Sequence, residues 1–173
     1  MTRAIRLTLL LIAIVLVQTT ILPYLRVFGV VADLGLVATV AVAYREGPET
    51  GAIFGFAAGL SMDLFLQTPL GLSALAYALT GYFIGILQGG LLRRAWWIAP
   101  VLGALGGIIA GLLSIGIGAL VGQEQLFALR SLRLVLLAAV YDALVAPIMF
   151  PIVSFAIRGG NPRTTSEVGR PGW

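Results

Sequence analysis

Long apolar stretches alternate with short breaks that contain proline, glycine or arginine along most of the chain. A helix needs roughly 20 apolar residues to cross the hydrocarbon core of a bilayer, or somewhat fewer when flanking side chains reach toward the interface. Six stretches approach that length: Ile5–Leu22, Val30–Tyr44, Gly51–Leu66, Leu70–Leu92, Trp96–Val121 and Leu132–Ile157. The pattern predicts an all-α membrane protein, with a bundle of about six transmembrane helices in residues 1–158.

Two of these stretches allow a second interpretation. The stretch from Val30 to Tyr44 is short and begins beside Asp33, so an interfacial or re-entrant segment is the alternative to a span. The first stretch follows Arg3 and Arg6 in the manner of a signal peptide, but it lacks a small-x-small cleavage site, so we expect it to remain as an anchor. The tail, residues 159–173, is polar and is predicted to be disordered and cytoplasmic.

The positions of the arginines predict the orientation of the bundle. With the N-terminus inside, the inner segments carry Arg3, Arg6, Arg45, Arg93, Arg94, Arg158, Arg163 and Arg170, whereas the outer loops carry Arg26, Arg130 and Arg133. Cytoplasmic loops of membrane proteins are enriched in basic residues. Both termini are therefore predicted to be cytoplasmic.

The composition supports a membrane protein of one domain. Hydrophobic residues make up 60% of the chain and charged residues 10%, with a mean hydropathy of +1.04. An ordinary globular domain is about 45–50% apolar and about 25% charged. No polar linker divides the chain, so we expect a single domain.

The residue types that the sequence lacks narrow the possible functions. The chain has no Cys, no His and no Lys, and all 11 basic residues are Arg. Thiolate and imidazole metal ligands, Ser-His and Cys-His nucleophile pairs and catalytic lysines are therefore absent. We expect no enzyme activity, no cofactor and no metal. The net charge of +4 comes from arginines at segment ends and not from a basic stripe, which argues against nucleic acid as a partner.

Glycines recur at helical spacing in three of the predicted helices. The sets are Gly51, Gly55 and Gly59, then Gly81, Gly85 and Gly89, then Gly103, Gly107 and Gly111. Residues four apart share a helix face, and small residues let helices approach closely in lipid, where no hydrophobic force drives them together. We interpret the sets as packing inside the bundle. A groove for a partner helix or a substrate cavity is the alternative.

Two carboxylates lie inside apolar stretches. Asp142 is about nine residues, or about 14 Å, from the outer end of the last predicted helix, close to the bilayer midplane, and Asp63 lies in the outer half of the third. A charged Asp at the centre costs about 2.5–3.5 kcal/mol. We therefore expect Asp142 to face the bundle, neutral or hydrogen-bonded, with transport or proton relay as the alternative. Tyr141-Asp142 matches half of the signature of paired-aspartate intramembrane proteases, but no Gly-x-Gly-Asp surrounds Asp63, so we reject that enzyme.

A polar cluster is predicted toward the outer leaflet. Gln18, Asp33 and Asp63 fall there by depth, on the same side as three arginines, so these side chains are candidates for partner binding or for buried polar contacts. Taken alone, Asp33 is best explained as the cap of its helix, because a carboxylate suits the positive end of the helix dipole.

Several short motifs occur in an order and spacing typical of one protein family. They are Val17-Gln18-Thr19-Thr20, Ala32-Asp33-Leu34, Arg45-Glu46-Gly47-Pro48, the run from Gly51 to Leu60 with Asp63, Pro69-Leu70-Gly71-Leu72, Leu75-Ala76-Tyr77, Gly81-Tyr82, and Tyr141-Asp142 with Pro147. In this order they resemble the rod shape-determining protein MreD family. Two positions depart from that family, because its members often have Pro where Ala32 stands and a neutral polar residue where Asp142 stands.

The resemblance implies a multi-pass protein of the bacterial inner membrane that acts in cell elongation. Members of the family are scaffolds that bind MreC and, with it, couple MreB filaments to the RodA polymerase and its penicillin-binding partner. Through that complex they influence cell shape and sidewall peptidoglycan synthesis. The family is also similar in fold to the substrate-binding membrane components of energy-coupling vitamin transporters.

Two functions of different classes follow from these expectations. In the first the chain is a non-enzymatic scaffold, and in the second it binds a small molecule for an ATP-driven transporter. A binder needs a pocket with convergent polar groups. The predicted outer cluster is sparse and contains no His, Lys or Trp, which favours the scaffold. Self-association is left open.

Overall fold

The computed structural model describes residues 3–25, 30–65, 70–87, 97–120 and 129–158. Within these residues the fold is six α-helices and one 3-10 helix, with no β-strand. The elements are α1 (Arg3–Thr20), η1 (Leu22–Leu25), α2 (Leu34–Glu46), α3 (Pro48–Phe65), α4 (Leu72–Leu87), α5 (Ile98–Leu120) and α6 (Leu129–Arg158). The predictions for the tail, for Arg26, Arg93, Arg94 and Gly89, and for most of the outer loop before Ser131 lie outside the described residues.

The sequence predicts the order of the helices, but the predicted start of the second helix is wrong. Residues 30–33 are not helical, and α2 begins only at Leu34. The backbone of Asp33 is extended, with φ −99° and ψ 91°. An apolar run therefore continues through a break in secondary structure that hydrophobicity alone does not show.

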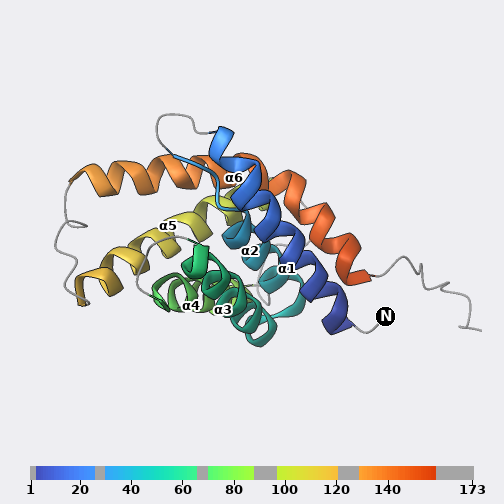
Figure 1. Ribbon diagram of the computed structural model, residues 1–173. Coiled ribbons are helices and arrows are strands. Elements are labelled where there is room, and N and C mark those ends of the chain that lie inside the picture. Colours follow the sequence, from blue (N-terminus) through green and yellow to red (C-terminus); the bar gives the residue numbers. More distant parts are fainter. Residues whose placement is uncertain (1–2, 26–29, 66–69, 88–96, 121–128, 159–173) are drawn as a thin grey trace, which may run out of the picture.

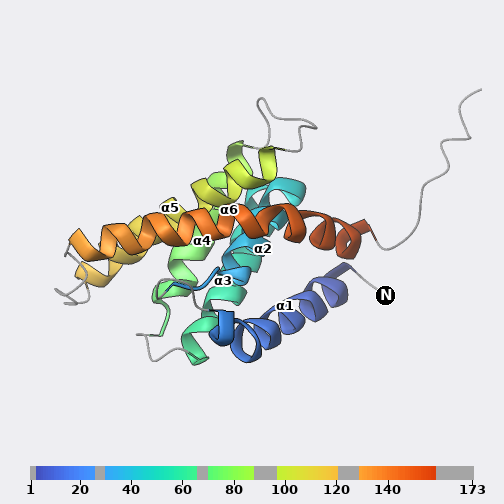
Figure 2. The same ribbon diagram turned by 90° about the horizontal axis from the view of Figure 1, so that it is seen from above.

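Helix α2 lies at the centre of the bundle. All ten residues from Leu34 to Ala43 are buried, and the other helices surround it (Figures 1 and 2). A helix that is apolar on every side is stable only when it is covered on every side. Its 13 residues span about 20 Å at about 1.5 Å per residue, which is shorter than a bilayer core. Helix α2 alone is therefore too short for a full span, and non-helical residues 30–33 precede it.

Helices α3 and α4 pack as an antiparallel hairpin through glycines. A Cβ atom built on Gly55 would lie 2.5 Å from the carbonyl oxygen of Tyr77, and one built on Gly59 would lie 2.4 Å from that of Ser73. Real Cβ atoms do not approach backbone so closely. The hairpin therefore depends on the absence of a side chain at these positions.

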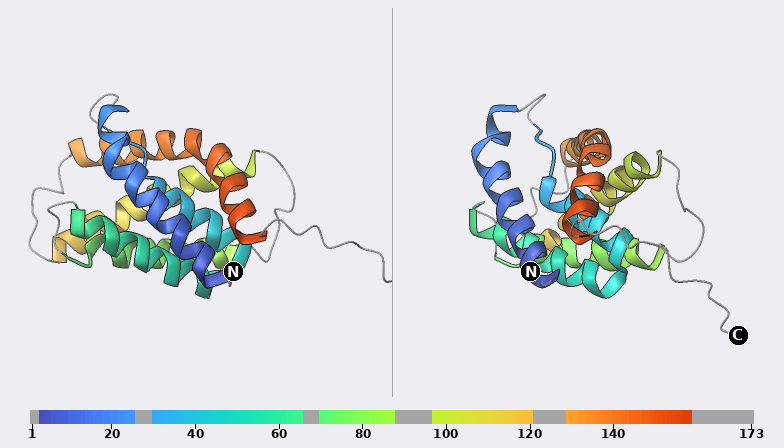
Figure 3. Two further views of the ribbon diagram at one scale, coloured as in Figure 1. Left: turned by 45° about the vertical axis from the view of Figure 1, so that its right-hand side comes forward. Right: turned by 90° about the vertical axis from the view of Figure 1, so that its right-hand side faces the viewer.

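Helices α5 and α6 form the second long hairpin. Gly103, Gly107 and Gly111 of α5 face α6, where added Cβ atoms would meet Asp142, Ala139 and Val135. Helix α6 contains Pro147 and Pro151 and bends in its second half (Figures 1 and 3). Proline removes a backbone donor and crowds the preceding turn, which accounts for a bend there.

Two helices are long and apolar enough to cross a membrane: Ile98–Leu120, and Leu132–Ile157 within α6. Two further apolar helices, Ala4–Thr20 and Leu72–Leu87, are too short to meet the same requirement of length. Helix length therefore supports two spans, whereas the sequence pattern predicts about six.

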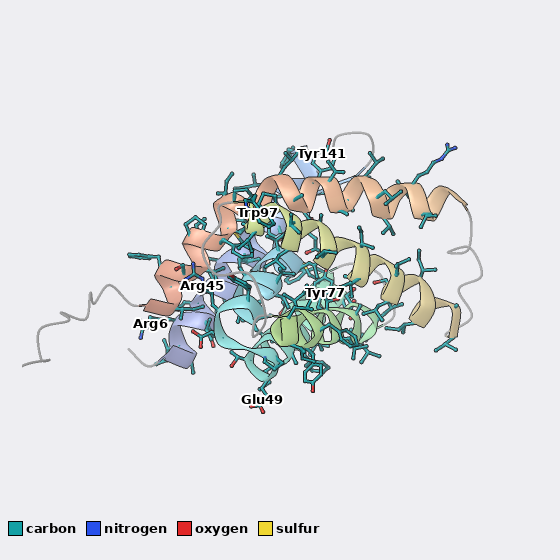
Figure 4. The ribbon with its side chains drawn as sticks, turned by 180° about the vertical axis from the view of Figure 1, so that it is seen from behind. Arg6, Arg45, Glu49, Tyr77, Trp97 and Tyr141 are labelled. Atoms are coloured by element: carbon teal, nitrogen blue, oxygen red, sulfur yellow. The ribbon has the colours of Figure 1, made fainter. Side chains whose placement is uncertain are left out.

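One end of the bundle gathers several chain segments. The first turn of α1, the last turn of α6 and the link between α2 and α3 lie together there (Figure 3). Arg6, Arg45 and Glu49 are at this end (Figure 4). The opposite end holds the C-terminus of α5 and the N-terminus of α6.

Candidate functional site

Four polar side chains from different parts of the chain converge on the N-terminus of α2. They are Gln18 of α1, Asp33 before α2, Tyr77 of α4 and Asp142 of α6. Asp142 is 1% exposed and Tyr77 is 7% exposed, while Gln18 and Asp33 are half-buried. We call this group the α2 clamp.

Asp33 caps α2, which agrees with the interpretation of this residue as a helix cap. Its Oδ1 accepts a hydrogen bond of 3.0 Å from the backbone N–H of Leu36. Such a cap supplies acceptors to donors that have no partner in the first turn of a helix. Its Oδ2 accepts a hydrogen bond from the hydroxyl of Tyr77, which ties the cap to α4.

Gln18 holds the chain on either side of Asp33. Its Oε1 accepts from the N–H of Leu34 at 2.9 Å, and its Nε2 donates to the carbonyl of Ala32 at 3.2 Å. The primary amide is suited to this position because it offers a donor and an acceptor on one side chain. A single residue of α1 thus satisfies two backbone groups of the segment that enters α2.

Asp142 completes the clamp from α6. Its Oδ1 accepts from the backbone N–H of Asp33 at 2.8 Å. Its Oδ2 lies against α5, where a Cβ atom on Gly107 would come within 2.8 Å of it. The glycine is therefore what leaves room for a carboxylate between α5 and α6.

Together the clamp satisfies the first backbone donors of α2. The N–H groups of Asp33, Leu34 and Leu36 go to Asp142, Gln18 and Asp33, and that of Val37 goes to the carbonyl of Asp33 at 2.9 Å. Buried backbone donors without partners are costly, so these bonds explain how α2 can start inside the bundle. The carboxylates also lie at the positive end of the α2 dipole.

Asp63 has a different partner set. It is 3% exposed, and Oδ2 accepts from the N–H of Gly71 at 2.9 Å and of Ala74 at 3.2 Å. The N–H of Ser73 lies 3.2 Å from Oδ1 and 3.1 Å from Oδ2. Asp63 of α3 therefore closes the N-terminus of α4 and joins the two helices of the hairpin.

The cluster predicted from depth differs from the one in the structure. Gln18 and Asp33 come together as expected, but the third carboxylate beside them is Asp142, and the group points into the bundle. Depth along separate helices cannot show which faces meet. Arg133 is exposed, and the side chains of Arg26 and Arg130 lie outside the description.

Tyr77 is the clamp residue that the sequence analysis does not single out. It stands among apolar residues of α4, where a tyrosine is most simply explained as core packing. Two signals mark it in the sequence: it belongs to the motif Leu75-Ala76-Tyr77, and it stands four residues before Gly81, on the same helix face.

The glycines named from the sequence lie at helix contacts. Gly51 faces Ala43 and Gly81, and Gly85 faces Pro48. Gly55 and Gly59 meet α4, and the glycines of α5 meet α6. These contacts are within the chain and account for the close approach of its helices.

The described residues contain no group of three or more His, Cys, Asp or Glu side chains arranged to hold a metal ion. Comparison of the chain with protein-family models, with curated protein sequences and with solved structures gives no match.

Proposed function

We propose that the chain is a multi-pass protein of the bacterial inner membrane and a non-enzymatic scaffold of the cell-elongation complex that binds MreC. The first support is the surface, where large apolar side chains are widely exposed. Examples are Ile53 at 72%, Leu144 at 67% and Phe155 at 75% exposure. Apolar surface of this extent marks contact with a membrane or a protein partner.

The proposed orientation places both termini in the cytoplasm. The end of the bundle that holds Arg6 and Arg45 would face the cytoplasm, in agreement with the bias of basic residues,. All six helices would carry the chain across the bilayer, with α2 and the non-helical residues 30–33 together making the second crossing. Helix α2 would stay inside the bundle, because non-helical backbone at membrane depth is tolerated only where protein or a water-filled cavity covers it.

One observation carries the proposal: residues from separate motifs of the resemblance meet at the α2 clamp. Gln18, Asp33, Tyr77 and Asp142 belong to four motifs that lie far apart in the sequence, and hydrogen bonds join them around one helix terminus. Motifs that meet in space support a resemblance more strongly than motifs that match only in order.

The clamp also favours a scaffold over the substrate-binding component of a transporter. In transporters, a helix N-terminus at mid-membrane depth receives an anionic group of the substrate. Here the carboxylates of Asp33 and Asp142 already occupy the N-terminus of α2, and the polar atoms of the clamp are bonded to the chain's own backbone. A binder would need convergent polar groups directed at a ligand.

The test is co-purification from membranes in a mild detergent, with tagged full-length chain and co-expressed MreC. A scaffold should retain MreC at a constant ratio through size-exclusion chromatography. Extraction of the purified protein should release no small molecule in an amount comparable to that of the chain. Absence of MreC together with a bound small molecule would overturn the scaffold proposal in favour of the transporter component.

Orientation is tested separately with reporter fusions. A reporter after Trp173 and one inserted between Gly122 and Ser131 should give opposite signals, cytoplasmic and external. Equal signals at the two sites would contradict the proposed topology.

A further inference from the structure

Helix α1 lies at the edge of the bundle (Figures 2 and 3) and packs differently from the other helices. Helices α2 to α6 take part in contacts where a glycine brings two backbones together, such as Gly55 with α4 and Gly107 with α6. Helix α1 contains no glycine, and the glycine contacts above join the other five helices to one another. Close packing and interhelical hydrogen bonds hold helices together in lipid, so α1 depends more on the second.

The inner face of α1 is made of large apolar side chains. Ile14 and Val15 are buried, at 4% and 8% exposure, and the partly buried side chains on the same helix are Leu7, Leu10 and Leu11. Lipid tails are as apolar as leucine, so a bilayer offers these side chains similar contacts when the helix moves away. Apolar packing therefore gives α1 little preference for the bundle over the surrounding lipid.

Gln18 makes a contact that lipid cannot replace. It accepts from the N–H of Leu34 and donates to the carbonyl of Ala32, both in the segment that enters α2. The hydroxyls of Thr8 and Thr19, by contrast, bond to carbonyls of α1 itself. A hydrocarbon tail offers neither a donor nor an acceptor, so separation of α1 from α2 leaves an amide side chain and two backbone groups without partners.

The depth of these two bonds decides their weight. Asp142 bonds to the residue between the two partners of Gln18 and lies near the middle of α6 (Leu129–Arg158), so the bonds of Gln18 are also within the membrane. Arg6 belongs to the other end of α1, at the end of the bundle proposed to face the cytoplasm (Figure 4). Water at that interface can take over the contacts of a guanidinium group.

The rest of the α2 clamp does not depend on α1. The N–H of Asp33 goes to Asp142 of α6, and that of Leu36 goes to Asp33. The other carboxylate oxygen of Asp33 accepts from Tyr77 of α4. Release of Gln18 would therefore leave the cap of α2 in place, and α2 to α6 would stay together through their glycine contacts.

We propose that α1 is a movable helix that Gln18 latches to the entry of α2. In the latched state, which is the one in the structure, α1 contacts α2, α3 and α6. In the released state it remains in the membrane but separates from them, and residues 30–33 are held by Asp142 and Tyr77 alone. The position of an outer helix is thereby coupled to the segment that begins the central helix. This inference rests on the membrane placement proposed above and does not depend on MreC.

Distances between paired spin labels test the latch, because the chain has no Cys of its own and labels attach to introduced cysteines. Ile12→Cys with Ile148→Cys measures α1 against α6. Ile53→Cys with Ile148→Cys is the matched control and measures α3 against α6. The three isoleucines are exposed, Ile12 at 51%, Ile148 at 64% and Ile53 at 72%, so labels at these positions do not disturb the core. In lipid nanodiscs each pair should give one main distance when Gln18 is present.

Gln18→Ala should release α1. We expect a second population of longer distances in the α1–α6 pair, while the α3–α6 distance stays the same. The ratio of released to latched protein should rise about eightfold, since each of the two interhelical hydrogen bonds contributes about threefold in a membrane. Thr19→Ala is the matched control variant, because it removes only bonds within α1. It should leave both distances unchanged.

Three results would overturn the latch. One is an α1–α6 distance that Gln18→Ala leaves unchanged, another is an equal change in the α3–α6 pair, which indicates general loosening, and the third is an equal effect of Thr19→Ala. If Gln18→Ala does not accumulate, Gln18→Met takes its place, since methionine keeps the length of the side chain but has no N–H to donate. The reporter fusions show independently whether the membrane placement itself has failed.

Discussion

The carboxylate of Asp142 accepts a hydrogen bond from the backbone N–H of Asp33, which lies 109 positions earlier in the chain, at 2.8 Å. This bond joins the last helix to the terminus of the central one. It explains why an acidic residue stands within an apolar span, because the alternative is an unsatisfied backbone donor inside the bundle. The acid is therefore part of how α2 begins.

Replacement of Asp142 separates a structural acceptor from a group that must carry charge. In Asp142→Asn the amide oxygen still accepts from the N–H of Asp33, so we expect normal abundance and normal function. In Asp142→Leu the donor is left unsatisfied, at a cost of about 1–3 kcal/mol in unfolding free energy. Complementation of a shape-defective strain, with membrane abundance measured by blot, checks both variants. A well-expressed Asn variant that fails, beside a Glu variant that works, would establish a role for the charge.

Gln18 should matter for stability although it is half-buried. Gln18→Ala removes both bonds to the segment that enters α2, and we expect a loss of about 1–3 kcal/mol. Thr8→Ala is the control, because Thr8 bonds only to a carbonyl of its own helix and is exposed. Thermal unfolding in detergent gives the unfolding midpoint of each variant. Equal midpoints for both variants would show that α1 does not hold the clamp.

The sequence predicts most of the helices, and the structure adds which helix faces pack against one another. Hydrophobic runs and glycine spacing predict the helices and the surfaces through which they pack, because both depend on residues close in the chain. The late start of α2 and the meeting of Gln18, Tyr77 and Asp142 depend on residues from three other helices. No local pattern contains that information. Asp33 could be predicted as a cap because capping is a local effect.

Asp63 is expected to hold the α3–α4 hairpin at its turn. Asp63→Ala removes the acceptor for the N–H groups of Gly71, Ser73 and Ala74. Loss of a helix cap costs about 0.5–2 kcal/mol. Hydrogen exchange should therefore speed up at these three amides and remain unchanged at amides in the middle of α5. Exchange that rises equally everywhere would indicate general unfolding and not the loss of a local cap.

The glycine contacts of the same hairpin give the largest expected effect. A Cβ atom on Gly55 would lie 2.5 Å from the carbonyl oxygen of Tyr77 and 2.7 Å from Thr39 Cγ2, so Gly55→Leu must separate α3 from α4. Overpacking of this kind costs about 1–3 kcal/mol, and more where backbone must move. We expect aggregation in detergent or a clear fall in the unfolding midpoint.

Gly116 provides the matched control for Gly55, because it is also a helical glycine but has nothing within 4 Å of an added Cβ atom. Gly116→Leu should accumulate and unfold like the wild type, since its side chain enters open space on α5. Size-exclusion profiles of the two variants, followed by co-purification with MreC, separate loss of the fold from loss of a partner site. An intact Gly55→Leu protein that no longer retains MreC would mean that this glycine face contacts the partner. If Gly55→Leu instead matched the wild type in both assays, the close packing of α3 against α4 would be wrong.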